Sequence, residues 1–168
     1  ALIIATEGGL RLPLVYNTSA YDGIETLKLL DGVVDIYMPD FKFLNALATE
    51  RYCAAKDYPE TAQKSILEMY RQLGDLQINA DGIAYKGLLI RHLIMPNGLS
   101  DTHKILAFIA RKISTNTYVN IMSQYRPCGS AKHTDDLTTT IGVKEYRNAL
   151  CIARNLGFVR LDGHGPFP

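Results

Sequence analysis

The sequence predicts an α/β protein built around a parallel sheet. Short runs of continuous apolar residues alternate along the chain with longer segments in which apolar residues recur at helical spacing. The apolar runs are continuous rather than alternating, which is typical of parallel strands that helices cover on both faces. The chain has 168 residues, of which 47% are hydrophobic, and this suits one compact domain with a substantial core.

Apolar runs predict the strands of this sheet. In chain order they are Leu12–Tyr16, Val33–Met38, Leu88–Met95, Tyr118–Met122 and Phe158–Leu161. Leu89 and Ile121 lie inside two of these runs, so we expect both side chains in the core.

Amphipathic segments predict the helices between the strands. The longer helices are expected at Pro59–Gly74, at a segment capped by Ser100 or Asp101 that runs to Ile113, and at Val143–Gly157. Their inward stripes are Ala62, Ile66, Met69 and Leu73; Ile105, Phe108, Ile109 and Ile113; and Val143, Tyr146, Leu150, Ala153 and Leu156. Shorter helices are expected at Leu2–Gly9, Ile24–Asp31 and Leu44–Cys53.

Three segments interrupt this alternation. Asp81 and Gly82, between apolar flanks in Leu76–Tyr85, predict a small β-hairpin inserted before the strand at Leu88. Ser130–Thr140 is the most polar stretch and is predicted to be an exposed, mobile loop. The Gly-His-Gly segment at 163–165 is interpreted as a frayed tail rather than a metal site.

Repetition of strand and helix is typical of a βα barrel or of a doubly wound sheet. A closed eight-stranded barrel needs about 250 residues, so this chain would form only part of one. The chain starts at Ala1 without an initiator Met, inside a predicted helix. We therefore expect residues 1–168 to form one domain, a partial barrel whose first strands lie upstream.

Composition excludes several classes of partner. Eighteen basic and seventeen acidic residues leave a formal net charge of +1, so neither nucleic acid nor an anionic membrane is an expected partner. No apolar run approaches the roughly 20 residues of a membrane span. Cys53, Cys128 and Cys151 are odd in number and widely spaced, which favours a reducing, cytoplasmic location over a disulfide framework.

Polar side chains follow four consecutive predicted strands, where the carboxyl ends of parallel strands place the chemistry of α/β proteins. The candidate site residues are Asn17, Thr18, Asp40, Lys42, Arg91, His92 and Gln124. Each also has a structural interpretation: the first two as turn or cap residues, Asp40 and Lys42 as a simple ion pair, and His92 as a core histidine facing away from Arg91. Arg91 within an apolar run requires an anionic partner.

The strand-end phrases together resemble the radical S-adenosylmethionine (SAM) proteins related to pyruvate formate-lyase activating enzyme. The phrases that carry the resemblance are LVYNTSAYD at Leu14–Asp22, DIYMPDFK at Asp35–Lys42, LLIRHLIMPN at Leu88–Asn97 and YVNIMSQY at Tyr118–Tyr125. No standard phosphate-binding or hydrolytic motif accompanies them.

The resemblance implies a partial six-stranded βα barrel that binds SAM and a [4Fe–4S] cluster. It also implies reductive cleavage of SAM to a 5′-deoxyadenosyl radical, which abstracts hydrogen from a glycyl radical protein or a small molecule. A reductant such as flavodoxin or ferredoxin would supply the electron. The cofactor-binding residues that it implies are Asn17, Thr18, Met38, Asp40, Lys42, Arg91 and Gln124.

The chain departs from the family pattern at two motifs. The Cys-x3-Cys-x2-Cys motif is absent, and three scattered cysteines do not replace three clustered thiolates. The Gly-Gly-Glu strand end is also missing, and Gln124 stands where activating enzymes commonly carry a histidine that contacts the ribose. We therefore expect the cluster segment upstream of Ala1 and an inactive fragment without it.

Two other functions remain open from the sequence. Lys42 could act as a Schiff-base nucleophile with Asp40 as a proton shuttle, as in βα-barrel aldolases. Alternatively, the chain could be a degenerate barrel fragment that acts as a binding or scaffold module through an exposed sheet edge.

Overall fold

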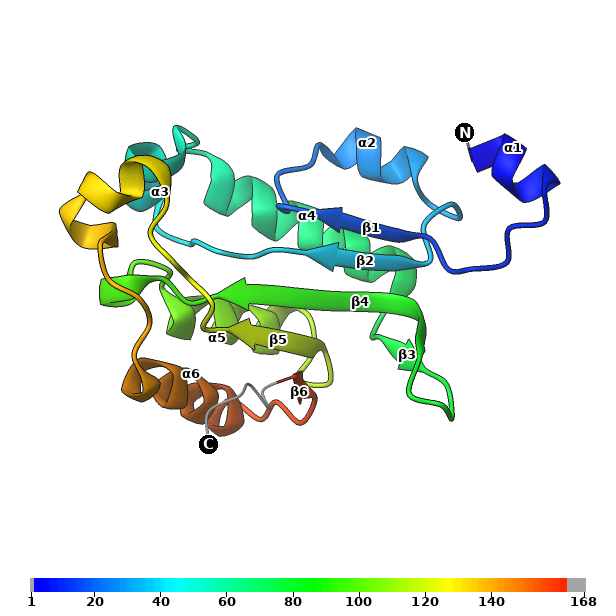
Figure 1. Ribbon diagram of the computed structural model, residues 1–168. Helices are drawn as coiled ribbons and strands as arrows, with labels where there is room; N and C mark the ends of the chain where they lie inside the picture. The colour runs from blue at the N-terminus through cyan, green and yellow to red at the C-terminus, as the bar shows by residue number, and fades with distance from the viewer. Residues whose placement is uncertain (1, 163–168) are drawn as a thin grey trace.

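The computed structural model describes residues 2–162 and shows an α/β protein with a mostly parallel sheet (Figure 1). The parallel strands are β1 (Val15–Thr18), β2 (Ile36–Pro39), β4 (Ala84–Leu93), β5 (Tyr118–Met122) and β6 (Leu161–Asp162). β3 (Gln77–Ile78) pairs antiparallel with β4 and forms the predicted hairpin. The predicted tail at 163–165 lies outside the described residues.

The parallel strands are arranged in the order in which they occur along the chain, β1-β2-β4-β5-β6. A doubly wound sheet reverses its strand order part-way, and this sheet does not. Right-handed crossovers that always step in the same direction place their helices on the same face. Figure 1 accordingly shows α4 (Tyr58–Leu73) and α5 (Thr102–Lys112) behind the sheet. The sheet is therefore mostly parallel, with its parallel strands in chain order.

The core lies between the sheet and these helices. Side chains on the helix-covered face are fully or almost fully buried, namely Tyr37, Leu88, Ile90, His92, Val119 and Ile121. The apolar ones pack in one cluster with Ile66 and Met69 of α4 and with Ile105 and Ile109 of α5. This burial confirms Ile121 as a core residue.

The opposite face of the sheet, called the open face here, is only partly buried. It carries Asn17, Met38, Leu89, Arg91, Asn120 and Met122. The expectation that strands are covered on both faces is therefore wrong for the described chain, and Leu89 is not a fully buried core residue. Side chains alternate between the two faces along each strand, and the apolar open-face residues concealed that alternation in the sequence.

The helices follow their predicted stripes closely. α4 has Pro59 in its first turn, buries Ala62, Ile66 and Met69, and ends at Gly74, whose φ of 68° is in the left-handed region. α2 (Ile24–Leu29), α3 (Ala46–Cys53), α6 (Val143–Asn155) and the exposed α1 (Leu2–Glu7) complete the set.

Two helix details differ from expectation. Asp101 precedes α5, but its side chain makes no capping hydrogen bond and its φ is 53°. Val143 was expected on the inward stripe of α6, but it is the first residue of that helix and is 39% exposed.

The observed strand ends differ most from the predicted ones where pairing with a neighbouring strand decides where the strand begins. β1 begins at Val15 rather than Leu12, and β4 begins at Ala84 because the hairpin arm runs straight into it. Phe158 is buried but precedes β6, which comprises only Leu161 and Asp162. Pairing, not hydrophobicity, sets these ends.

The connection from β5 to α6 crosses the carboxyl edge of the sheet and reaches α3, as Figure 1 shows. It contains two short 3-10 turns, η2 (Gly129–His133) and η3 (Asp135–Leu137). The hydroxyl of Tyr52 on α3 donates to Asp136 Oδ2 at 2.6 Å, and Leu137 is buried. The stretch predicted as an exposed loop is therefore anchored at η3. None of the described helices has the length and apolar character that crossing a membrane requires.

Candidate functional site

A cluster of charged side chains lies on the open face at the carboxyl ends of β2 and β4. Asp40 and Arg91 are register partners, and Arg91 Nε donates to Asp40 Oδ1 at 2.6 Å. Lys42 Nζ donates to the other carboxylate oxygen, Oδ2, at 2.7 Å. One carboxylate therefore pairs with two cations, and it is the anionic partner that the sequence predicted for Arg91. The side chain of Asp40 is 14% exposed, that of Arg91 24% and that of Lys42 33%.

The backbone around this cluster is fixed from several directions. Phe41, between the two charged residues, points into the core, and its N–H donates to the carbonyl of Arg91 at 2.8 Å. The Tyr58 hydroxyl donates to the carbonyl of Asp40 at 2.9 Å and accepts from the N–H of Lys42 at 3.3 Å. Burial raises the pKa of Tyr58, so the hydroxyl stays protonated for the bond it donates.

His92, beside Arg91, belongs to the core, as the structural interpretation of the sequence predicted. It is fully buried, and Nδ1 lies 2.8 Å from the carbonyl oxygen of Phe41. A carbonyl only accepts, so Nδ1 carries the proton and Nε2 accepts from the Thr102 hydroxyl at 2.9 Å. Burial lowers the pKa of His92 to about 4, so the ring is neutral at pH 7. It ties the ends of β2 and β4 to the start of α5.

Arg91 also connects the cluster to β1. Its Nη2 donates to Asn17 Oδ1 at 2.8 Å. Thr18 does not join them, because its hydroxyl donates to Asp22 Oδ2 at 2.6 Å in the turn after β1. Met38 is on the open face as the register partner of Asn17.

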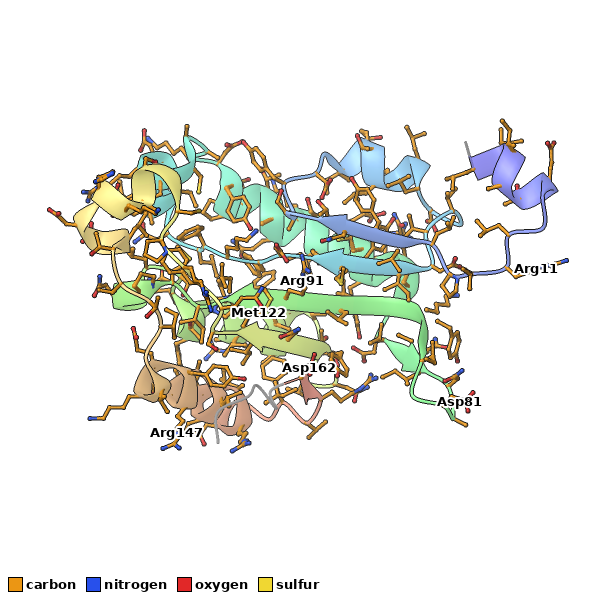
Figure 2. All side chains as sticks on the ribbon, in the orientation of Figure 1. Arg11, Asp81, Arg91, Met122, Arg147 and Asp162 are labelled. Atoms are coloured by element: carbon orange, nitrogen blue, oxygen red, sulfur yellow. The ribbon has the colours of Figure 1, made fainter. Side chains whose placement is uncertain are left out.

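A pocket of about 380 Å³ opens beside the cluster. Its lining residues are Asp40, Lys42, Arg91, Leu93, Met122, Gln124, Tyr125, Arg126 and Cys128. Figure 2 shows Arg91 and Met122 together on the open face. The volume is within the range of small-molecule sites, and three basic side chains against one acidic side chain make the lining electropositive.

The pocket unites four of the residues selected from the sequence, Asp40, Lys42, Arg91 and Gln124, while Asn17 contacts it through Arg91. Arg126 was not among the site residues selected from the sequence, whereas Cys128, beside the strand end at Gln124, was the cysteine expected near a pocket, and it lines this one. They follow β5 on the connection that crosses the carboxyl edge, so only the path of that connection brings them to the site. The signal in the sequence was a basic residue within four positions of a strand end.

A larger hollow of about 450 Å³ lies elsewhere, between the start of α5 and α6. One carboxylate oxygen of Asp101, Oδ2, is buried there without a hydrogen-bond partner, while Oδ1 pairs with Lys104 at 3.0 Å. The hollow contains none of the strand-end residues. We place the candidate site at the smaller pocket, because the convergent charges lie there.

The described residues offer no iron–sulfur site. Cys53, Cys128 and Cys151 are exposed and unbridged. No group of three or more His, Cys, Asp or Glu side chains within residues 2–162 is arranged to hold a metal ion. A cluster bound through three cysteine thiolates would therefore need ligands from outside this part of the chain.

Comparison with known proteins gives one clear similarity. No family model and no solved structure matches the chain. An uncharacterized protein from the archaeon Methanocaldococcus jannaschii is 36% identical over 143 residues, which are 84% of this chain. The same region is only 38% of the archaeal protein. The chain thus spans well under half the length of this relative.

Proposed function

We propose that this chain is the C-terminal part of a radical SAM barrel and that its carboxyl-edge pocket holds the methionine end of SAM. The observation that carries the proposal is the convergence of Arg91 and Lys42 on Asp40 at the ends of adjacent parallel strands. Two of the phrases that resemble the family contain these same residues. Strand order is consistent with a barrel segment.

The residues present fit the carboxylate of SAM. A guanidinium has five N–H donors and an ammonium has three. Arg91 uses donors toward Asp40 and Asn17, and Lys42 uses one toward Asp40, so both retain donors for a ligand carboxylate. Such charge-assisted hydrogen bonds are short and strong.

Asp40 has a positioning role in this proposal. Each of its oxygens already accepts from a cation, so it holds Arg91 and Lys42 in place instead of binding the ligand alone. An amino group of SAM would share these oxygens with the two cations. Gln124 presents an amide at the pocket rim, where it can bind the hydroxyls of a ribose.

The cluster must come from elsewhere in the intact protein, because the described cysteines do not converge. Beside a [4Fe–4S] cluster, bound SAM would supply the radical chemistry of hydrogen abstraction. A flavodoxin or ferredoxin is the proposed reductant, and a glycyl radical protein or a small molecule the proposed substrate. A cytoplasmic location accords with the oxygen-sensitive chemistry of such a cluster.

The direct test is calorimetric titration of the chain with SAM. We expect binding that Asp40→Ala and Lys42→Ala each weaken by about tenfold or more, since each disrupts charge-assisted hydrogen bonds. Both variants should stay folded. Lys42→Ala should keep a melting temperature close to that of the parent, whereas Asp40→Ala should lower it, since it leaves Arg91 and Lys42 without their shared anion. The matched control is Lys64→Ala, which removes an exposed ion pair with Glu60 on α4 and should leave SAM affinity unchanged.

Two outcomes would contradict the assignment. Absence of SAM binding to the folded chain is one, and an equal loss of thermal stability in Asp40→Ala and Lys42→Ala that accounts for their weaker binding is the other. An independent test is the EPR spectrum of the longer archaeal relative after anaerobic reconstitution and reduction. A [4Fe–4S]⁺ signal that changes on SAM addition would support the family assignment.

A further inference from the structure

Arg126 is a cation with no internal partner at the edge of the pocket. It lines the pocket with Lys42 and Arg91. Within residues 2–162 no side chain or carbonyl forms a hydrogen bond or ion pair with its guanidinium. Lys42 and Arg91 already share the Asp40 carboxylate, so Arg126 is the one basic side chain of the pocket lining without an acidic partner among the described residues.

The backbone places Arg126 firmly rather than leaving it on a free loop. The hydroxyl of the preceding residue, Tyr125, donates to the carbonyl of Leu137 at 2.9 Å. The following residue is Pro127, which restricts the backbone of the residue before it. Arg126 therefore stands on a segment held at both sides, and little ordering is needed for it to bind a ligand.

The net positive charge of the pocket favours an anionic ligand, and SAM is not a net anion. Lining side chains leave two positive charges uncompensated. SAM contributes a sulfonium, an ammonium and one carboxylate, so it adds positive charge overall. Arg126 is exposed, while Lys42 and Arg91 beside it are partly buried. Because opposite charges attract, these three cations favour an anion, and a net cationic ligand does not supply it.

We propose that the pocket also binds a small anionic molecule, whose carboxylate or phosphate group pairs with Arg126. Leu93, Met122 and Tyr125 provide the apolar wall against which the rest of that molecule would lie. The proposal goes beyond the SAM assignment and does not depend on it. If SAM binds at Arg91 and Lys42, the anionic molecule is the substrate beside it.

The test is calorimetric titration of the chain with succinate and with inorganic phosphate, against chloride at equal ionic strength. We expect saturable binding of at least one anion, weakened about tenfold or more in Arg126→Gln because a charge-assisted hydrogen bond is lost. The control is Arg147→Gln, an exposed arginine of α6 outside the pocket (Figure 2), which should bind as the parent does. Circular dichroism checks that both variants are folded.

The two anions distinguish the source of the charge. Succinate alone would indicate a carboxylic acid, and phosphate alone a phosphate ester. Equal anion binding by the parent and Arg126→Gln, or no binding beyond the chloride control, would overturn the proposal.

A parallel SAM titration separates this inference from the proposed function. We expect Arg126→Gln to change SAM affinity less than about threefold, while it weakens anion binding about tenfold or more. If SAM affinity falls as far as anion affinity, Arg126 binds the SAM carboxylate, and the proposal of a second, anionic ligand is wrong. If the anion binds and SAM does not, the radical SAM assignment fails and the anion site stands.

Discussion

The two faces of the sheet treat polar groups in opposite ways, and neighbouring residues of β4 show it best. Arg91 points to the open face, where it pairs with Asp40 and remains 24% exposed. His92 points to the helices, is fully buried and is neutral at pH 7. Its two ring nitrogens are both hydrogen-bonded inside the protein.

The difference shows which polar groups are free to act. A buried polar group must be fully satisfied by its own fold, since an unpaired one is costly. His92 meets this requirement and has no donor or acceptor left. Arg91 and Lys42 retain hydrogen-bond donors because partial exposure lets water satisfy them. The open face is therefore where a ligand can replace water.

The largest expected contrast between the faces is in stability. Ile121→Ala should lower the free energy of unfolding by about 2–5 kcal/mol, because it leaves a cavity in the packed core. Leu89→Ala, on the open face, should cost about 1 kcal/mol, since that side chain is already partly exposed. Denaturant titration of both variants measures the difference. Equal losses would mean that the open face is covered in solution.

Acid should reveal the neutral histidine on the helix-covered face. Unfolded, His92 takes up a proton near its ordinary pKa of 6.5, whereas in the fold it does so only near 4. The unfolded state thus binds more protons between these values, and the stability from neutral His92 is complete above pH 6.5 and lost as pH falls toward 4. The loss is about 3 kcal/mol.

Unfolding free energies measured across this pH range give the slope. In His92→Gln the part of the slope due to this residue should disappear, although the variant is less stable throughout. An unchanged slope would show that the His92 ring is protonated or solvent-accessible in the fold.

The smallest expected effect concerns the link between the faces. Tyr58→Phe removes the hydroxyl that bonds the backbone of Asp40 and Lys42. We expect a loss of about 1–2 kcal/mol in stability, since two hydrogen bonds to the backbone are removed, and SAM binding weakened severalfold. Tyr70→Phe, on the same helix, is the control. Unaltered binding in Tyr58→Phe would show that the strand end keeps its geometry without this bond.

Much of the fold was predictable because periodicity reports local burial. Tyr118–Met122 was predicted with the bounds that β5 has, and α4 differs from its predicted range by one residue at each end. The open face was not predictable, because Leu89 and Met122 are as apolar as residues of a covered strand. Whether helices cover a face depends on strand order, which periodicity does not contain.

The site was predictable in part, where residues follow directly from strand ends. Strand ends locate Asp40, Lys42 and Arg91, since parallel strands finish at a common edge. Arg126 was missed as a site residue because its place depends on how the connection after β5 crosses that edge. Thr18 was selected for its position, but the short turn to Asp22 uses its hydroxyl.

The contact between Tyr52 and Asp136 joins residues 84 positions apart, and this separation affects the order of assembly during synthesis. Each parallel strand pairs with the parallel strand before it in the chain. The strands can therefore pair one after another as the chain emerges from the ribosome. The pocket cannot form in this stepwise way. The pocket rim at Arg126 takes its position only after η3 has emerged from the ribosome and contacted α3. Helix α3 is synthesised much earlier and lacks this contact until then. Binding competence should therefore appear after the pairing of β1 through β5 in the nascent chain, and it does not require β6, which follows η3 in the sequence.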